Sequence, residues 1–349
     1  MSADFDPNAA SSSDSGVFGL PHGVDDAAVV LVPVPWEVTT SYGGGTSEGP
    51  RAILAASRQV DLFDLDVERP YEAGIVMLDE PAEVRRWNAE GKALAQPIVD
   101  AGGAGTEHEG ALAKVDALGR DLDAWVRATA LEHMRREKIV GVVGGDHAVP
   151  FGAVAAAADH HGPLGVLHFD AHSDTRRAYE GFARSHASIM FNVLEEIPRV
   201  SRLVQVGIRD VCEEEIAYTR AAGDRVRTFF DRDLARRKHD GEPFGAVARE
   251  IAAALPDRVW VSFDIDGLDP RLCPHTGTPV PGGLDFWEAV RVLREVCAAG
   301  KRIVGFDLNE VAPNLADPGD EWDGNVGARL LYKLVGFTLA SQGRARLLP

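Results

Sequence analysis

Residues 164–174 read LGVLHFDAHSD, an apolar run that ends abruptly in two aspartates and a histidine. The first six residues have the length and apolar character of a strand buried on both faces, as in a parallel sheet. In the extended segment that follows, alternate side chains point the same way, so Asp170, His172 and Asp174 are expected to converge on one point. The stretch therefore predicts a strand that delivers three potential ligands at its carboxyl end.

Similar short apolar or β-branched runs recur along the chain, with amphipathic stretches between them. They lie at residues 28–32, 74–78, 139–143, 203–206, 225–229, 259–264 and 302–306. The clearest helix covers residues 109–136, where apolar residues recur at steps of three and four. This alternation predicts an α/β fold, a three-layer α/β/α sandwich with a mostly parallel β-sheet.

The composition describes an ordinary globular chain. It has 349 residues, of which 45 % are hydrophobic and 26 % charged. The formal charge of −18 disfavours nucleic acid and anionic membranes as partners. No apolar run is long enough to span a membrane, the N-terminal residues have neither the basic nor the apolar region of a signal peptide, and the three cysteines are scattered. We therefore expect a cytoplasmic protein.

Two segments are too polar to belong to the regular fold. Residues 1–26 are rich in Ser, Asp, Gly and Pro, and we expect them to form a flexible N-terminal extension. Residues 27–349 are then expected to form a single catalytic domain. Within that domain, residues 307–323 are rich in Pro, Asp and Gly, which indicates a functional loop.

Two further predicted strands also end in acidic turns, at 144–147 (GGDH) and at 264–270 (DIDGLDP). Each turn alone has a structural explanation: an aspartate N-cap in the first and an Asx-rich turn in the second. Three such turns in one chain favour a shared metal site, because clustered carboxylates resist joint ionisation unless cations are present. Two divalent ions about 3.5–4 Å apart are a common solution. Oxygen and imidazole donors without thiolate suit Mn²⁺, with Ni²⁺, Fe²⁺, Co²⁺ or Zn²⁺ as alternatives.

The segments GGDHAVP (144–150), FDAHSDT (169–175) and SFDIDGLDP (262–270) resemble, in order and spacing, the three metal-binding motifs of the ureohydrolase superfamily. This superfamily includes arginase, agmatinase, guanidinobutyrase and formimidoylglutamase. The resemblance covers almost everything after the N-terminal extension, and it implies an arginase-like fold with two Mn²⁺ per chain. The ligands it implies are His147, Asp170, Asp174 and Asp264 for one ion, and His172, Asp170, Asp264 and Asp266 for the other.

The resemblance also implies an activity, the hydrolysis of an amidino C–N bond by a metal-bridging hydroxide with release of urea. Asp174 would stabilise the nucleophile and move its proton to the departing amine. Glu310 would hold the guanidinium by paired hydrogen bonds. His186 matches the proton-shuttling histidine of the superfamily, although Ala187 stands where a glycine is usual, so a loop histidine without a role is the alternative.

The substrate is less defined. The positions with which arginases recognise the amino-acid end of arginine are Arg176 and Cys212 here, which disfavours L-arginine, and Thr175 is more typical of agmatinase. The loop 176–184 contains three arginines, which are either solvated surface charge or a site for a substrate carboxylate. We assign Arg176, together with His186 and Glu310, to substrate binding.

We therefore expect an agmatinase- or guanidinobutyrase-like manganese enzyme that acts on a small guanidino or amidino compound. Alternatives are an arginase, a formimidoylglutamase, a nickel-dependent guanidine hydrolase and, more remotely, a metal-dependent deacetylase or a non-catalytic partner subunit. As is common in the superfamily, a homotrimer or homohexamer is expected. His168 is expected to be a buried, hydrogen-bonded histidine beneath the site. The aromatic residues Trp36, Tyr42, Phe286 and Trp322 either line a pocket or, as we favour, pack in the core.

Overall fold

A parallel sheet forms the centre of the computed structural model, which describes residues 5–349. Its eight strands follow the order β3-β1-β4-β9-β8-β5-β6-β7, and all neighbours pair in parallel. The strands are β1 (Val29–Val34), β3 (Ile75–Met77), β4 (Ile139–Gly144), β5 (Leu164–Phe169), β6 (Val200–Ile208), β7 (Val226–Phe230), β8 (Arg258–Asp264) and β9 (Arg302–Asn309). Each coincides with a predicted run, so the predicted α/β class is confirmed.

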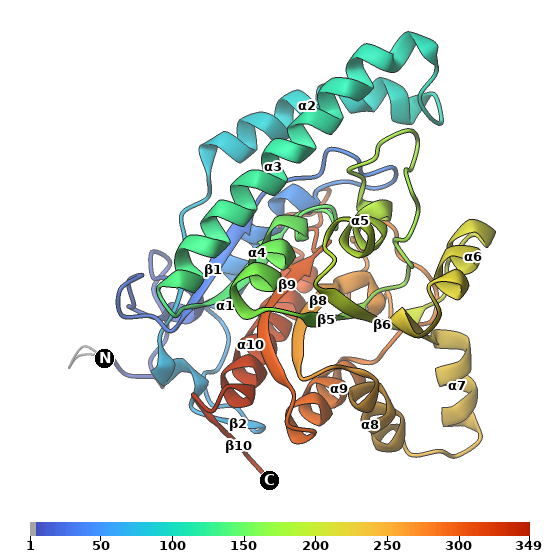
Figure 1. The fold of residues 1–349 in the computed structure, drawn as a ribbon. Coiled ribbons are helices and arrows are strands. Elements are labelled where there is room, and N and C mark those ends of the chain that lie inside the picture. Colours follow the sequence, from blue (N-terminus) through green and yellow to red (C-terminus); the bar gives the residue numbers. More distant parts are fainter. Residues whose placement is uncertain (1–4) are drawn as a thin grey trace.

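Helices cover both faces of the sheet and complete the three layers (Figure 1). One apolar layer lies under α1 (Gly49–Ser57), α8 (Phe244–Ala254), α9 (Phe286–Ala298) and α10 (Trp322–Ser341). The other lies under α2 (Ala82–Asp100), α3 (Glu109–Arg135), α4 (Phe151–His161) and α5 (Ile189–Glu196). The helices α6 (Glu213–Ala221) and α7 (Asp231–His239) follow β6 and β7, and β2 (Val67–Glu68) pairs antiparallel with β10 (Arg346–Leu347). No helix in residues 5–349 is long and apolar enough to cross a membrane.

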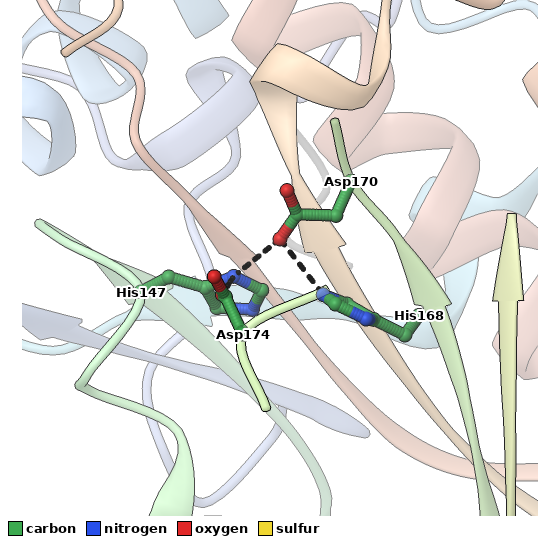
Figure 2. A group of neighbouring side chains, drawn as sticks. All are labelled: His147, His168, Asp170 and Asp174. Atoms are coloured by element: carbon green, nitrogen blue, oxygen red, sulfur yellow. Dashed lines mark hydrogen bonds and ion pairs between the residues drawn. The ribbon is translucent and has the colours of Figure 1, made fainter. Parts of the chain in front are cut away.

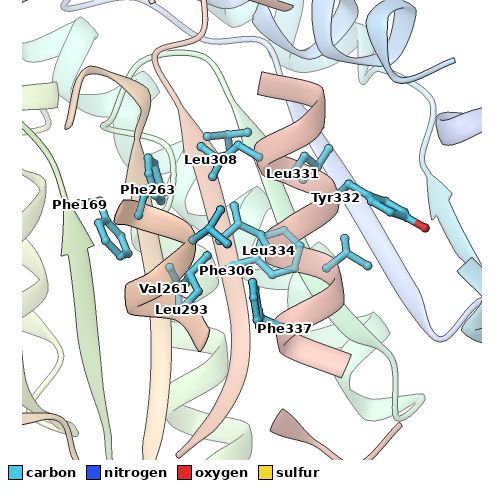
Figure 3. Packing of buried hydrophobic residues seen from close by; sticks show 14 of the residues in the cluster. Phe169, Val261, Phe263, Leu293, Phe306, Leu308, Leu331, Tyr332, Leu334 and Phe337 are labelled. Carbon is cyan, nitrogen blue, oxygen red and sulfur yellow. The ribbon is translucent and has the colours of Figure 1, made fainter. Parts of the chain in front are cut away.

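Alternate residues of a central strand face opposite layers, which explains why the strands read as continuous apolar runs. Leu167 and Phe169 of β5 belong to one apolar layer, and Leu164 and Val166 belong to the other. Figure 3 shows the first layer, in which side chains of β5, β8 and β9 pack against α9 and α10. Burial on both faces fixes the register of the strands and hence the position of the residues that follow them.

Strand β9 is longer than predicted. The sequence places its end at residue 306 and a loop from 307, but the strand continues to Asn309 and the loop begins at Glu310. Asp307 and Asn309 remain in the strand because the Asp307 carboxylate accepts hydrogen bonds from neighbouring side chains of the same sheet. The prediction was wrong here because their polarity suggested a loop.

Part of the predicted flexible extension is packed against the fold. Val17, Phe18 and Leu20 are buried. The Phe18 N–H donates to Ser57 Oγ at 3.0 Å, and the Phe18 ring lies 4.9 Å from that of Tyr332. The prediction of a loose segment is therefore wrong over these residues, since the short apolar run within it is long enough to dock. Residues 1–4 lie outside the described part of the chain.

Candidate metal centre

The carboxyl ends of four central strands meet at one edge of the sheet. His147 follows β4, Asp170 follows β5, Asp264 ends β8 and Glu310 follows β9. The three strands that carry the motifs are not all neighbours. Strands β5 and β8 are adjacent, whereas β9 separates β8 from β4. The site is therefore built from four strand ends rather than three, as expected for a ligand site in a parallel sheet.

One half of the cluster is centred on His147 (Figure 2). Its Nδ1 lies 3.0 Å from Asp170 Oδ2, 3.1 Å from Asp174 Oδ2 and 3.3 Å from Asp264 Oδ2. All four side chains are buried, and Figure 2 shows His147, Asp170 and Asp174 directed at one point. Four donor atoms that converge within this radius can surround a single cation.

The other half is centred on His172. Its Nδ1 lies 3.1 Å from Asp266 Oδ2 and 3.4 Å from Asp170 Oδ1. Asp170 thus turns one oxygen to each half of the cluster, in the manner of a bridging carboxylate. The structure brings the six residues of the implied ligand set together, and the groups His147–Asp170–Asp174 and Asp170–His172–Asp266 are compact enough to hold a metal.

Backbone N–H groups orient these carboxylates before any cation binds. Ala171 N–H donates to Asp266 Oδ1 at 3.0 Å, and Asp266 N–H donates to Asp264 Oδ1 at 2.8 Å. Asp174 has a left-handed backbone (φ 54°), and its carbonyl accepts the N–H groups of Met190 and Phe191. Such a conformation is costly for a non-glycine residue and persists where the surroundings hold it, often at a functional site.

The electrostatics of the cluster fit divalent cations. Burial and the neighbouring Asp170 raise the pKa of Asp174 to about 8. Burial, Asp266 and Asp170 raise the pKa of Asp264 well above its usual range. His147 has a raised pKa because its contacts with Asp170, Asp174 and Asp264 outweigh the effect of burial. Burial therefore disfavours the charged forms of Asp174 and Asp264, and bound divalent cations would favour them. The oxygen and imidazole donors suit Mn²⁺-like ions.

Glu310 lies beside the cluster with one oxygen free. Its Oε1 accepts a hydrogen bond from the backbone N–H of His147 at 2.9 Å. Its Oε2 is buried without a hydrogen-bond partner among residues 5–349. Its left-handed backbone (φ 62°) is held by an N–H bond to Gly145 O and by the Thr276 hydroxyl, which donates to Glu310 O. An unpartnered buried oxygen is costly, so Oε2 is suited to accept an N–H from a bound ligand.

A cavity of about 480 Å³ opens above the cluster, and His172, Asp174 and His186 line it. The backbone N–H of His186 donates to Thr39 Oγ1 at 3.2 Å. Burial, together with the charges of His172 and His147, lowers the pKa of His186 to about 4. His186 is therefore neutral near pH 7, and its side chain lies at the cavity beside His172 and Asp174.

The far wall of the cavity carries charges of both signs. Arg176 stacks on the ring of Tyr179 at 4.9 Å, and its Nε lies 3.7 Å from Glu215 Oε2. Glu215 is buried and accepts the backbone N–H groups of Thr175 and Cys212. Asp210 also lines this wall, without an ion pair to any described residue. The wall thus presents two carboxylates against one guanidinium.

Two sequence expectations about neighbouring residues have different outcomes. His168 is fully buried beneath the cluster, with Nε2 2.8 Å from Asp170 Oδ2, as predicted. Trp36 packs in the core, but Tyr42 is 74 % exposed at the cavity and Trp322 is 46 % exposed, so core packing is wrong for these two. Phe286 is half-buried.

Residues that the sequence analysis did not select also belong to the site, namely Asp307, Ser262 and Gln205. Asp307 Oδ1 accepts the Ser262 hydroxyl at 2.8 Å, and Ser262 Oγ lies 2.9 Å from His147 Nε2. Gln205 Nε2 lies 3.2 Å from His168 Nδ1. The sequence signal that could have identified these residues is a polar side chain inside an otherwise apolar strand.

Comparison with known proteins agrees with this geometry. A model of the arginase family matches residues 27–336. N(1)-aminopropylagmatine ureohydrolase of Thermus thermophilus is 34 % identical over 316 residues, which cover 90 % of this chain and 91 % of that protein. Proclavaminate amidinohydrolase of Streptomyces clavuligerus is 32 % identical over 321 residues (90 % and 89 %). The solved structure of that enzyme superimposes with a TM-score of 0.71 at 24 % identity, over 95 % of this chain and 99 % of the other.

Proposed function

The chain belongs to the arginase family of C–N hydrolases that act on linear amidines, and we propose that it is an agmatinase-type enzyme whose guanidino substrate carries an amine at its far end. The observation that carries this proposal is the free Glu310 Oε2 beside a buried cluster that fits two cations. A guanidinium needs a carboxylate partner, and the attacking water needs activation. His172 and Asp174 of the cluster line the cavity, and Glu310 contacts the cluster through the backbone N–H of His147.

The roles of the residues follow from their positions. Two divalent cations, when bound, lower the pKa of a water molecule so that it attacks at neutral pH. Glu310 accepts N–H bonds from the guanidinium and orients its carbon toward the cluster. Asp174, which belongs both to the cluster and to the cavity wall, is placed to hold the proton of the attacking water and return it to the departing amine. Water is thereby added across the C–N bond, and urea and an amine leave.

The amine at the far end is inferred from the charges of the cavity wall. Arg176 is offset by Glu215, and the other arginines of the loop face elsewhere: Arg177 stacks on Phe191, and Arg184 pairs with Asp123 and Glu196. Asp210 keeps an unpaired carboxylate toward the cavity. Agmatine and its aminopropyl derivative, the compound in the name of the Thermus thermophilus relative, have this chemistry.

A second candidate substrate is 4-guanidinobutyrate, because the Arg176 guanidinium also lines the cavity. The two candidate substrates differ in the charge at the end remote from the guanidino group, which is positive in agmatine and negative in 4-guanidinobutyrate. We expect Asp210→Asn to lower kcat/KM for agmatine about tenfold, a loss of ~1.4 kcal/mol, and to leave 4-guanidinobutyrate unaffected. Loss of 4-guanidinobutyrate turnover in Arg176→Gln, with no effect of Asp210→Asn on agmatine, would favour the second candidate.

Urea release decides the reaction class. The experiment measures urea or ammonia released from a panel of candidate substrates with Mn²⁺ or Ni²⁺ added. The panel comprises agmatine, aminopropylagmatine, arginine, 4-guanidinobutyrate, guanidine and formimidoylglutamate. We expect Asp170→Asn and Asp266→Asn to abolish turnover while circular dichroism shows the fold retained. Asp257→Asn, at an exposed position far from the cluster, is the matched control. Full activity in both site variants, or in chelated protein, would contradict the proposal.

Several finer properties belong to the same proposal. We assign two Mn²⁺ to the cluster, with Ni²⁺, Co²⁺ or Fe²⁺ as alternatives, because its donors are oxygen and imidazole nitrogen. Residues 27–349 are taken as one catalytic domain. The three cysteines are free, which is typical of the cytoplasm. A homotrimer or homohexamer is proposed by analogy with the superfamily.

A further inference from the structure

A loop without regular secondary structure forms one side of the cavity. It covers residues 273–280, reads CPHTGTPV and lies between β8 and α9. Thr278, Pro279 and Val280 of this loop line the cavity. Its two prolines lack an N–H group, and the loop belongs to no helix or strand, so its position depends on the side chains that bind it.

The middle of the loop packs against Glu310. The Thr276 hydroxyl donates to Glu310 O at 2.7 Å. At the next residue, Gly277, an added Cβ would lie 3.4 Å from Glu310 Oε2 and 3.4 Å from Tyr42 O. The backbone at Gly277 therefore bounds the space beside the oxygen that we assign to the guanidinium. A small shift of this backbone would change the room that a planar guanidinium has next to Glu310.

Side chains from two other elements hold the loop at its two ends. At one end, the Arg209 guanidinium donates to Val280 O from two nitrogens, at 2.9 and 3.2 Å. At the other end, Asp323 in the first turn of α10 binds His275 twice. Its Oδ1 accepts the backbone N–H of His275 at 3.0 Å, and its Oδ2 lies 2.8 Å from His275 Nδ1. One carboxylate thus fixes both the backbone and the ring of His275.

The pair of His275 and Asp323 has no part in the chemistry proposed above. Asp323 is buried, and His275 is its only ion-pair partner among residues 5–349. On the other side of the ring, His275 Nε2 lies 4.0 Å from Asp320 Oδ2. A carboxylate in the first turn of a helix stabilises that helix from its surface. Burial of Asp323 against a residue 48 positions earlier adds a desolvation cost that the helix alone does not explain.

We propose that Asp323 and His275 are positioning residues that hold the backbone of Thr276 and Gly277 beside Glu310, and so set the affinity of the site for the guanidino group. Neither residue lines the cavity. The inference rests on the proposed function, because it presumes that Glu310 receives a guanidinium. It adds to that function two residues outside both the implied ligand set and the substrate cavity.

The test is steady-state kinetics with the best guanidino substrate of the panel. Asp323→Ala removes both acceptors of His275. We expect it to raise KM about 10-fold or more and to leave kcat nearly unchanged, because binding of the guanidino group is weakened. Asp323→Asn is expected to restore KM, since its amide oxygen still accepts the backbone N–H and its amide nitrogen can donate to His275 Nδ1.

Two further variants test the same path independently. His275→Ala keeps the backbone hydrogen bond but removes the ring, so its KM should lie between those of wild type and Asp323→Ala. It also carries the test if Asp323→Ala does not fold. Gly277→Ala places a methyl group directly against Glu310 Oε2 and should raise KM in the same way.

A pair of competitive inhibitors separates positioning from a general loss of structure. Guanidinium ion competes for the space beside Glu310, whereas the amine product of the reaction lacks the guanidino group. In Asp323→Ala, the inhibition constant of guanidinium should rise about as much as KM, and that of the amine product should stay as in wild type. Equal weakening of both inhibitors would contradict the inference.

Asp64→Ala is the matched control. Asp64 is also buried, accepts two backbone N–H groups at 2.8 and 2.9 Å and pairs with Lys333, but it lies outside the cavity lining. Its loss should leave KM unchanged whatever its effect on Tm. Wild-type protein that hydrolyses no guanidino compound would contradict the proposed function and the inference with it. An active wild type, with KM unchanged in Asp323→Ala and His275→Ala or raised equally in Asp64→Ala, would contradict only the inference.

Discussion

In the proposed reaction, recognition of the guanidino group depends on Glu310. Replacing it with Gln exchanges the free Oε2 for an amide, which no longer complements a cation. We expect kcat/KM for agmatine to fall by about 10² or more, because loss of one partner of a buried charge pair costs about 2–5 kcal/mol. Mn²⁺ binding should be unchanged, since Glu310 is outside the ligand set. Glu214→Gln, at an exposed position, is the matched control, and a variant E310Q that retains normal kcat/KM would remove Glu310 from the site.

Single residues also show what the sequence could reveal. The six positions of the implied ligand set were expected to meet because three motifs at the ends of predicted strands resemble those of the ureohydrolase superfamily, and the structure brings their side chains together. Asp307 could not be predicted, since its polarity next to a proline-rich segment predicted a loop. Its three donors come from β8 and β9. A polar residue belongs to a strand or to a loop according to partners that are distant in sequence.

The contact between α3 and the loop before α5 makes a pH-dependent contribution to stability. Asp123 of α3 is buried, with Oδ2 3.3 Å from Arg184 Nε. Burial raises its pKa to about 7 in spite of Arg184, whereas its unfolded value is near 4. Between these values the native state binds a proton that the unfolded state lacks, so stability falls as pH rises, by up to about 1.4 kcal/mol per unit.

Asn at position 123 mimics the protonated acid and has no such slope. Wild type therefore loses stability between pH 5 and pH 8, and Asp123→Asn does not. The difference in the free energy of unfolding, Asp123→Asn minus wild type, is expected to be about 2 kcal/mol larger at pH 8 than at pH 5. Urea unfolding at the two pH values measures this. Asp121→Asn, exposed on the same helix, should show no difference between them. If the difference in unfolding free energy between Asp123→Asn and wild type is the same at both pH values, the carboxyl titrates in its ordinary range.

At the scale of the whole molecule, the eight strands were predictable but their order was not. Periodicity and burial identify a strand from its own residues. The order β4-β9-β8-β5 is set by how the helices cross over, and it depends on packing between segments as distant as β4 and β9. This order places β9 in the middle of the site and brings Asp307 and Glu310 beside motifs that lie more than 100 residues earlier in the sequence.

With cations in the proposed site, the same topology would link global stability to metal binding. The six ligand positions span residues 147–266, so they converge only in the folded chain, and a cation that binds them stabilises the native state alone. At a concentration 100 times Kd, each ion contributes about 2.7 kcal/mol. Dialysis against chelator should therefore lower Tm by several degrees, and added Mn²⁺ should restore it, as scanning calorimetry would show. Asp170→Asn, which removes the shared carboxylate, should abolish the response to Mn²⁺. A Tm that is the same in chelated and Mn²⁺-saturated wild-type protein would show that the buried carboxylates are balanced by protons alone.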